Sequence, residues 1–305
     1  MMTEKGIFSD LVRTYKSGNM TVKLIFINLL CFVAIGLFEV LGRNISSTFY
    51  TVMYYVVGLC TNFNEFIFRP WGIFTYMFAH FGFFHLLMNM LFLYVVGQYF
   101  EQFFSAKRMF YTYLLGGLFG GLFELVIHLI MPTMSGSYVI GASGSVMAVM
   151  TAIAFYQPQL TVSIWGLFNV RLIYIAMLFL FSNMYSVAMG ADTGTAHLAH
   201  LGGMFLGYLS VKNPFSSTNI VNRGMAIGDK LVGFFKHDRV QKGSFSYSKN
   251  RASQSVRNQS DEEYNYEKKL RQEKIDAILD KISKSGYESL TKEEKELLFS
   301  QSNKR

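Results

Sequence analysis

The chain has 305 residues, of which 51% are hydrophobic and 16% are charged, and its mean hydropathy is +0.27. Soluble globular proteins carry about 25% charged residues, so this composition is that of a membrane protein. Residues 1–212 hold 10 of the 28 Lys and Arg and 7 of the 20 Asp and Glu, which leaves most of the charge in the last third. These numbers exclude a single soluble domain.

The net charge of +8 would also suit a nucleic-acid-binding protein. Positive and negative residues are interleaved in the C-terminal third, however, as is typical of a solvated helical surface, so we do not expect nucleic acid as a partner. The two cysteines, Cys31 and Cys60, lie in apolar stretches and provide at most one disulfide and no metal framework. We interpret both as inert buried thiols.

Six apolar stretches are candidates for membrane-spanning helices, because a span across about 30 Å of hydrocarbon needs roughly 20 residues. They occupy residues 24–42, 84–103, 109–131, 143–157, 170–189 and 196–211. The predicted fold class is therefore all-α: a six-transmembrane-helix bundle over residues 24–212, preceded by a cytoplasmic N-terminal segment at residues 1–23.

The distribution of Lys and Arg predicts the orientation of the bundle. These residues concentrate before the first span, between the second and third spans at Lys107 and Arg108, and after the sixth. Cationic connections stay on the cytoplasmic side, so we expect both termini in the cytoplasm. The connection at residues 43–83 then lies outside, and its many aromatic residues suit the membrane interface.

Two further regions follow the predicted bundle. Residues 213–261 are rich in Ser and Asn in their second half, and we interpret them as a flexible linker. Residues 262–305 are predicted to form a small, soluble helical tail in which Thr291 and Glu294 have the spacing of a capping box. Two helices of this size bury little core, so we expect the tail to bind a cytoplasmic partner.

The fourth span is short for a membrane helix. Residues 143–156 make about 21 Å of helix at 1.5 Å per residue, against about 30 Å of hydrocarbon. We therefore expect its start to lie below the outer surface, with the preceding backbone dipping inward. Non-helical backbone is tolerated at that depth only beside protein or a water-filled cavity, so the start of this span is where we expect a site.

Polar residues inside the predicted spans concentrate at this same depth. Ser143 begins the fourth span, His200 lies one turn into the sixth, and His85 and Asn89 share a face of the second. The expected topology places all four in the outer half of the membrane. Polar groups in spans are costly and mark functional candidates.

These residue types are the parts of an acyl-transfer site. Histidine is the usual base for a serine hydroxyl, and backbone N–H groups at a helix start can donate to the oxyanion of the intermediate. An asparagine amide and a second histidine could supply further donors. Gly203 and Gly207 provide the small-residue spacing that lets the sixth span approach the fourth.

At these residues the chain resembles the rhomboid family of intramembrane serine proteases. The family's G-x-S-G motif matches residues 141–144, and its A-H-x-x-G-x-x-x-G motif matches residues 199–207. Its H-x-x-x-N motif matches His85 and Asn89. The resemblance covers about residues 24–212.

The resemblance implies a serine endopeptidase without a cofactor or a bound metal, whose substrates are transmembrane or membrane-proximal segments of membrane proteins in a lipid bilayer. It implies a catalytic dyad of Ser143 and His200, with His85 and Asn89 binding the oxyanion. The C-terminal tail resembles that of Bacteroidetes-type rhomboids, which implies the inner membrane of a bacterium.

Two positions depart from the family pattern. Trp71 is followed by Gly72, where rhomboids often have arginine, and this bears on how the first connection is anchored. Met147 stands four residues after the serine, where a tyrosine commonly stacks on the histidine, so we expect His200 to be held less firmly. Glu101, in contrast, falls where the family often has a glutamate.

Other interpretations of the same residues stay open. Ser143 could be a small packing residue, and His197, His200 and His85 could ligate a metal, although no H-E-x-x-H motif or acidic partner accompanies them. The alternative function is that of a catalytically inactive rhomboid-like protein that binds transmembrane clients. Such relatives usually lack the serine or the histidine, and this chain has both.

Overall fold

The computed structural model describes residues 7–43, 55–131, 138–164, 166, 168–190 and 196–235, together with residues 278, 281, 282, 290, 291 and 294 near the C-terminus. The chain divides into two compact units, Met1–Arg239 and Val240–Arg305. The predicted site residues all lie in the first unit.

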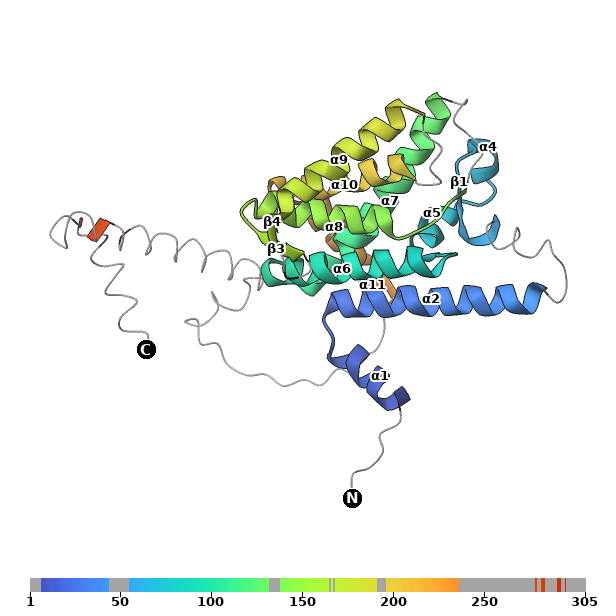
Figure 1. The fold of residues 1–305 in the computed structure, drawn as a ribbon, viewed down its shortest axis with the longest axis horizontal. Helices are drawn as coiled ribbons and strands as arrows, with labels where there is room; N and C mark the ends of the chain where they lie inside the picture. The colour runs from blue at the N-terminus through green and yellow to red at the C-terminus, as the bar shows by residue number, and fades with distance from the viewer. Residues whose placement is uncertain are drawn as a thin grey trace, which may run out of the picture. The chain divides into compact units, whose positions relative to one another are not determined.

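Helices lie in each of the six stretches singled out in the sequence. They are α2 (Met20–Arg43), α6 (Phe83–Phe103), α7 (Ala106–Ile130), α8 (Ser143–Tyr156), α9 (Leu172–Ala188) and α10 (His197–Lys212). Among the described residues, α2, α6 and α7 are long and apolar enough to cross a membrane, and α8 and α9 are shorter apolar helices. Figure 1 shows α2, α6 and α8 side by side, and α6 packs against both of the others.

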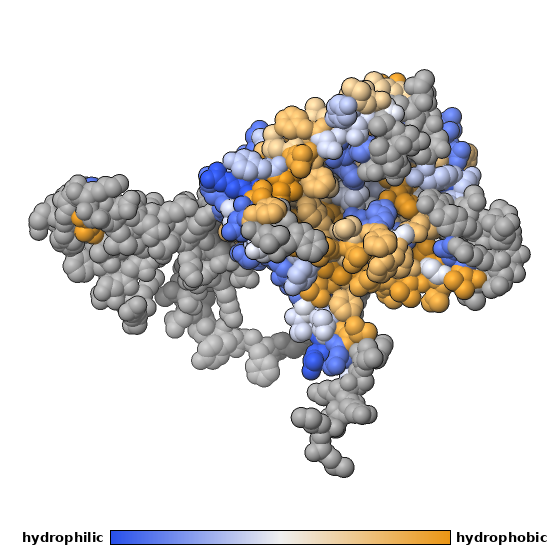
Figure 2. All heavy atoms as spheres, in the orientation of Figure 1, coloured by the Kyte–Doolittle hydropathy of each residue, from blue (hydrophilic) through white to orange (hydrophobic). Residues whose placement is uncertain are grey.

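The outer surface of the first unit is apolar along its helices. Large hydrophobic side chains are exposed on α2, α6 and α9, among them Leu30, Phe84 and Leu178. Figure 2 shows such residues gathered over α2 and α6. A helix of a soluble protein buries its apolar stripe against the core, so these faces are suited to lipid. The chain is an integral membrane protein.

Short elements organise the connection between α2 and α6. They are β1 (Leu59–Cys60), α4 (Phe63–Phe66), α5 (Gly72–Thr75) and the 3₁₀ helix η1 (Tyr76–Phe78). Strand β1 pairs antiparallel with β2 (Tyr138–Val139), which lies just before α8. A second antiparallel pair, β3 (Thr161–Ile164) and β4 (Phe168–Arg171), connects α8 to α9. The pairing of β1 with β2 therefore attaches the connection between α2 and α6 to the segment that precedes α8.

The linker prediction is wrong for part of its range. Helix α11 (Ile220–Phe235) lies inside the predicted linker 213–261 and packs on α7. The long Ser- and Asn-rich stretch that suggested a linker, residues 242–260, follows this helix, and a composition average over the whole range conceals the apolar residues of α11. Residues 236–261 lie outside the described residues. At the other end, helix α1 (Ile7–Ser17) lies within the predicted N-terminal segment.

Arg108 joins α7 to the end of α10 and to the start of α11. Its side chain is fully buried, and its guanidinium donates to the backbone oxygens of Ser210 at 2.6 Å and Pro214 at 2.8 Å and to the Asn222 side chain at 2.8 Å. Carbonyls at a helix C-terminus carry partial negative charge, so they stabilise the buried cation. This contact explains why α11 stays against the bundle.

Glu101 joins the end of α6 to the start of α2. Its carboxylate accepts hydrogen bonds from the backbone N–H groups of Met20 at 2.9 Å and Thr21 at 2.8 Å, and from the Thr21 hydroxyl. The first N–H groups of a helix lack intrahelical partners, and a negative charge there is favoured by the helix dipole. Glu101 is therefore the N-terminal cap of α2, supplied by another helix.

Glycines bring α10 into contact with α8 and α7. A Cβ atom at Gly203 would overlap the backbone carbonyl of Gly144, and one at Gly207 would overlap that of Ala148. Gly120 of α7 likewise leaves no space for a side chain, because a Cβ there would lie 2.7 Å from a backbone oxygen of α10. Small residues let membrane helices approach closely, and here they set the separation of α10 from α8.

In the second unit, the described residues include the predicted capping box. The Thr291 N–H donates to the Glu294 carboxylate at 2.8 Å, and the Glu294 N–H donates to the Thr291 hydroxyl at 3.3 Å. Lys281 forms an ion pair with the same carboxylate at 2.9 Å. The capping box at these two residues is confirmed.

We predict that Gly203→Ala destabilises the bundle, because the added methyl group would overlap the Gly144 carbonyl and overpacking costs about 1–3 kcal/mol. The midpoint of thermal unfolding in detergent should fall. Gly36→Ala is the matched control, since nothing lies within 4 Å of a Cβ at that position of α2. Equal midpoints for the two variants would contradict a tight contact at Gly203.

Candidate active site

Ser143 is the first residue of α8, and the turn before it is held by hydrogen bonds. The Gly141 N–H donates to the Tyr76 carbonyl at 2.9 Å, and the Ala142 N–H donates to His80 Nε2 at 3.3 Å. Gly141 has a φ of +118°, which favours glycine. This turn leaves Ser143 partly exposed, while the residues on either side of it are buried.

His200 lies opposite Ser143 in the first turn of α10. Its Nε2 atom is 2.7 Å from Ser143 Oγ, and only 8% of the His200 surface is exposed. This distance is that of a hydrogen bond and is within the reach required for general-base catalysis. The structure thus brings together the serine and the histidine that the sequence places on separate helices.

The second ring nitrogen of His200 faces Asn183 of α9. His200 Nδ1 is 2.8 Å from Asn183 Oδ1, and the Asn183 amide group donates to the Phe179 carbonyl at 2.7 Å. His197 Nδ1 is also 2.8 Å from Asn183 Oδ1. Asn183 is not among the site residues predicted from the sequence. Its polar side chain within the fifth apolar stretch could have identified it as a candidate, since polar groups in spans mark functional residues.

Glu124 of α7 caps the helix that carries His200. Its carboxylate accepts a hydrogen bond from the Ala199 N–H at 2.8 Å, and its backbone oxygen is 2.8 Å from His128 Nδ1. The first N–H groups of α10 have no intrahelical partners, so the carboxylate satisfies one of them next to the histidine. Glu124 therefore helps to place the backbone of His200.

The two predicted oxyanion binders lie on the first turns of α6. A Cβ at Gly141 would come within 2.7 Å of the His85 ring, which places that ring against the turn before Ser143. Asn89 Nδ2 donates to the His85 carbonyl at 2.9 Å, which uses one of its two amide hydrogens. His80, to which the sequence pattern assigns no role, packs edge-on against the His85 ring with the centroids 5.1 Å apart.

Part of the chain that carries these residues matches a known protein family. The rhomboid domain family matches residues 68–212, a range that contains every predicted site residue. Residues 68–212 form a rhomboid domain. Residues 259–304 separately match a family of unknown function, DUF6576, over most of the predicted tail.

Two proteins from Arabidopsis thaliana are similar to part of this chain. RHOMBOID-like protein 6, mitochondrial, is 28% identical over 140 residues, which are 46% of this chain and 42% of that protein. Inactive RHOMBOID-like protein 8 is 33% identical over 110 residues, which are 36% of this chain and 28% of that protein. The chain therefore spans less than half the length of either relative.

Gly72, the first departure from the rhomboid pattern, has a steric cause. A Cβ at this position would lie 2.7 Å from the Gly58 carbonyl oxygen, so a side chain would displace the connection. Arg69 anchors this segment instead. Its guanidinium pairs with Glu65 at 2.6 Å, donates to the Tyr55 carbonyl at 3.1 Å and lies 3.3 Å from the centre of the Tyr55 ring.

Met147, the second departure, is buried in the core. The ring next to His200 is that of His197, at 6.3 Å between centroids and an interplanar angle of 89°. His200 also has the hydrogen bond to Asn183. The His200 ring is therefore held by Asn183 of α9 and by His197 of its own helix, α10.

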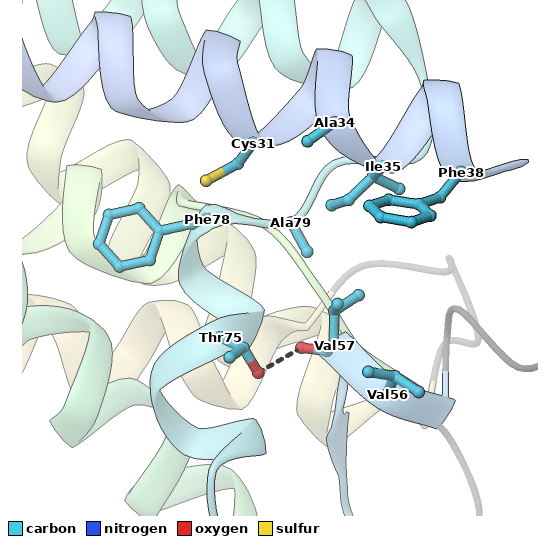
Figure 3. Close-up of a pocket in the computed structure, with 9 residues that line it drawn as sticks. All are labelled: Cys31, Ala34, Ile35, Phe38, Val56, Val57, Thr75, Phe78 and Ala79. Atoms are coloured by element: carbon cyan, nitrogen blue, oxygen red, sulfur yellow. Dashed lines mark hydrogen bonds between the residues drawn. The ribbon is translucent and has the colours of Figure 1, made fainter.

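An apolar cavity of about 450 Å³ lies away from these residues, between α2 and the first connection (Figure 3). Cys31 and Phe78 line it, and the Thr75 hydroxyl in its wall donates to the Val57 carbonyl at 2.8 Å. Neither Ser143 nor His200 takes part in its lining. This cavity is separate from the candidate active site.

Both cysteines are free. Burial raises the pKa of the Cys60 thiol, which keeps it protonated and makes it a poor nucleophile. In the part of the chain that the structure describes, no three His, Cys, Asp or Glu side chains lie together as a metal site would require.

We predict that Gly141→Ala impairs the site, because the methyl group would lie 2.7 Å from the His85 ring. A displacement of this kind near reacting groups costs about 10- to 100-fold in rate, which can be measured as the rate of covalent labelling of Ser143 by a fluorophosphonate. Gly166→Ala is the matched control: φ is +71° there, with nothing within 4 Å of a Cβ. Unchanged labelling of Gly141→Ala would refute the contact with His85.

Proposed function

We propose that this rhomboid-family protein is an intramembrane serine endopeptidase that cleaves transmembrane or membrane-proximal segments of membrane-protein substrates. The observation that carries the proposal is the 2.7 Å hydrogen bond between Ser143 Oγ and His200 Nε2. A neutral imidazole at this distance takes the hydroxyl proton as the oxygen attacks a peptide carbonyl. The proposed mechanism requires no cofactor.

The tetrahedral intermediate forms at the N-terminus of α8, where Ser143 is the first residue. Backbone N–H groups and the helix dipole favour negative charge there. His85 and the second amide hydrogen of Asn89 are the further proposed donors to the oxyanion. His200 then gives its proton to the leaving amine, and a water molecule activated by the same base releases the acyl-enzyme.

The substrate class follows from the position of the serine. A transmembrane helix has its carbonyl groups in hydrogen bonds, so it must unwind locally before one of them can reach Ser143. We therefore expect cleavage near helix-destabilising or small residues. The six-span topology, both termini in the cytoplasm, a bacterial inner membrane and a cytoplasmic partner for the tail belong to the same proposal.

Client binding without cleavage is the second candidate function. One relative, 33% identical over 110 residues, is named an inactive RHOMBOID-like protein. In this chain the serine and the histidine are both present and within hydrogen-bonding distance, which favours catalysis.

We predict that a fluorophosphonate labels the purified protein and that Ser143→Ala abolishes the labelling. His200→Ala should slow it by about 10⁴-fold or more, as expected when the base of a serine hydrolase is removed. Ser145→Ala is the matched control, because this second serine of α8 is fully buried and its hydroxyl faces Met77 Sδ at 3.9 Å. It should label like the wild type.

The same experiment decides between the two functions. Labelling that disappears in both Ser143→Ala and His200→Ala would support an activated serine and direct the search to substrates. A folded wild-type protein that does not react, in lipid as well as in detergent, would favour client binding.

A further inference from the structure

We infer that Asn183 is a positioning residue that selects the tautomer of His200, so that the working unit is Ser143, His200 and Asn183 instead of a dyad. The inference rests on the proposed function, because it assigns Asn183 a task in that reaction. Its basis is a chain of three hydrogen bonds that begins at the backbone of α9 and ends at the serine hydroxyl.

The orientation of the Asn183 amide is determined by its neighbours. Its nitrogen is 2.7 Å from the Phe179 carbonyl oxygen, which can only accept a hydrogen bond. Its oxygen therefore faces the other way, toward the imidazole of His200 at 2.8 Å. The side chain is only 4% exposed, so water has little access to compete for the oxygen.

The amide oxygen in turn determines where His200 carries its proton. Oδ1 of asparagine cannot donate, so the hydrogen bond requires a hydrogen on His200 Nδ1. In the neutral ring, Nε2 then has a free lone pair, and this is the atom 2.7 Å from Ser143 Oγ. The opposite tautomer would present an N–H group to the serine and could not act as a base.

His197 completes the arrangement around the same oxygen. Its Nδ1 atom is also 2.8 Å from Asn183 Oδ1, so two imidazoles approach the two lone pairs of one carbonyl oxygen. Asn183 therefore has a partner for each of its buried polar atoms. This reduces the freedom of the amide to rotate and thereby holds the plane of the His200 ring.

An amide suits this task inside a membrane. A carboxylate would also accept the Nδ1–H bond, but burying an ionised carboxylate is far more costly than burying a hydrogen-bonded amide. Asn183 lies in α9, one of the apolar helices of the bundle. A neutral acceptor supplies the orientation without a buried charge.

The test compares Asn183→Leu with Asn183→Asp in the full-length protein. Leucine keeps the approximate volume but cannot accept the hydrogen bond, so kcat for a cleavable transmembrane substrate should fall by about 10- to 100-fold with KM unchanged. Aspartate retains an acceptor oxygen for the Nδ1–H group and should restore part of the loss, at a cost in stability from its buried charge. Asn28→Leu is the matched control, because Asn28 is also buried and donates to the carbonyl four residues earlier, at 2.8 Å, but has its other contact with Tyr113.

A second measurement reads the tautomer without any activity. In ¹⁵N-histidine NMR at a pH where the imidazole is neutral, the His200 signals, assigned by their loss in His200→Ala, should show a protonated Nδ1 in the wild type. Asn183→Leu should shift this population toward Nε2–H, and Asn28→Leu should not.

These results separate the inference from the proposed function. A wild type that neither cleaves nor labels overturns the proposed protease, and the role of Asn183 in catalysis with it, even if the NMR shows the expected tautomer. An active wild type with unchanged kcat in Asn183→Leu, or with His200 protonated at Nε2, overturns the inference alone.

Discussion

The close contact of α10 with α8 is the constraint on which the candidate site depends. Ser143 and His200 are 57 residues apart in the chain, and their 2.7 Å contact exists only because these two helices approach backbone to backbone. Gly203, one turn after His200, lies where any side chain would overlap the Gly144 carbonyl. A side chain there would increase the separation of the two helices, and the serine and the histidine would move apart with them.

Several polar side chains inside the bundle each form hydrogen bonds that join one helix to another. Glu101 caps α2, Glu124 caps α10, Arg108 binds the carbonyls at the end of α10, and Asn183 accepts from two histidines. In hydrocarbon an unsatisfied polar group costs several kcal/mol, so each such residue must be placed beside a partner. The partners are helix ends and imidazoles, and these contacts hold the helices in register around Ser143.

The molecule combines this rhomboid domain with regions that the family match does not cover. Helix α11 lies beyond residue 212, where the rhomboid match ends, and is joined to the bundle through Arg108 and Asn222. The tail matches a different family, of unknown function. The connection between α2 and α6 also differs from the rhomboid pattern. It is held by the ion pair of Arg69 with Glu65, in place of an arginine after Trp71. Its strand β1 pairs with β2, in the segment before α8.

The sequence alone determined the local features of this protein. The start of α8 at Ser143, the other apolar helices and the Thr291–Glu294 capping box follow from hydropathy and from short-range spacing, which depend only on neighbouring residues. The candidate residues Ser143, His200, His85 and Asn89 were found in the same way, because polar groups stand out in apolar stretches.

Which helix faces meet depends on the packing of the whole bundle. The packing placed Asn183 against His200 and Glu124 against the start of α10, contacts that depend on helix rotation and on glycine positions far apart in the chain. It also placed α11 in a range that composition assigned to a linker, because packing on α7 and the Arg108 contacts stabilise that helix. The periodicity of a sequence indicates whether one face of a helix is apolar or polar, but it does not indicate which other helix packs against that face.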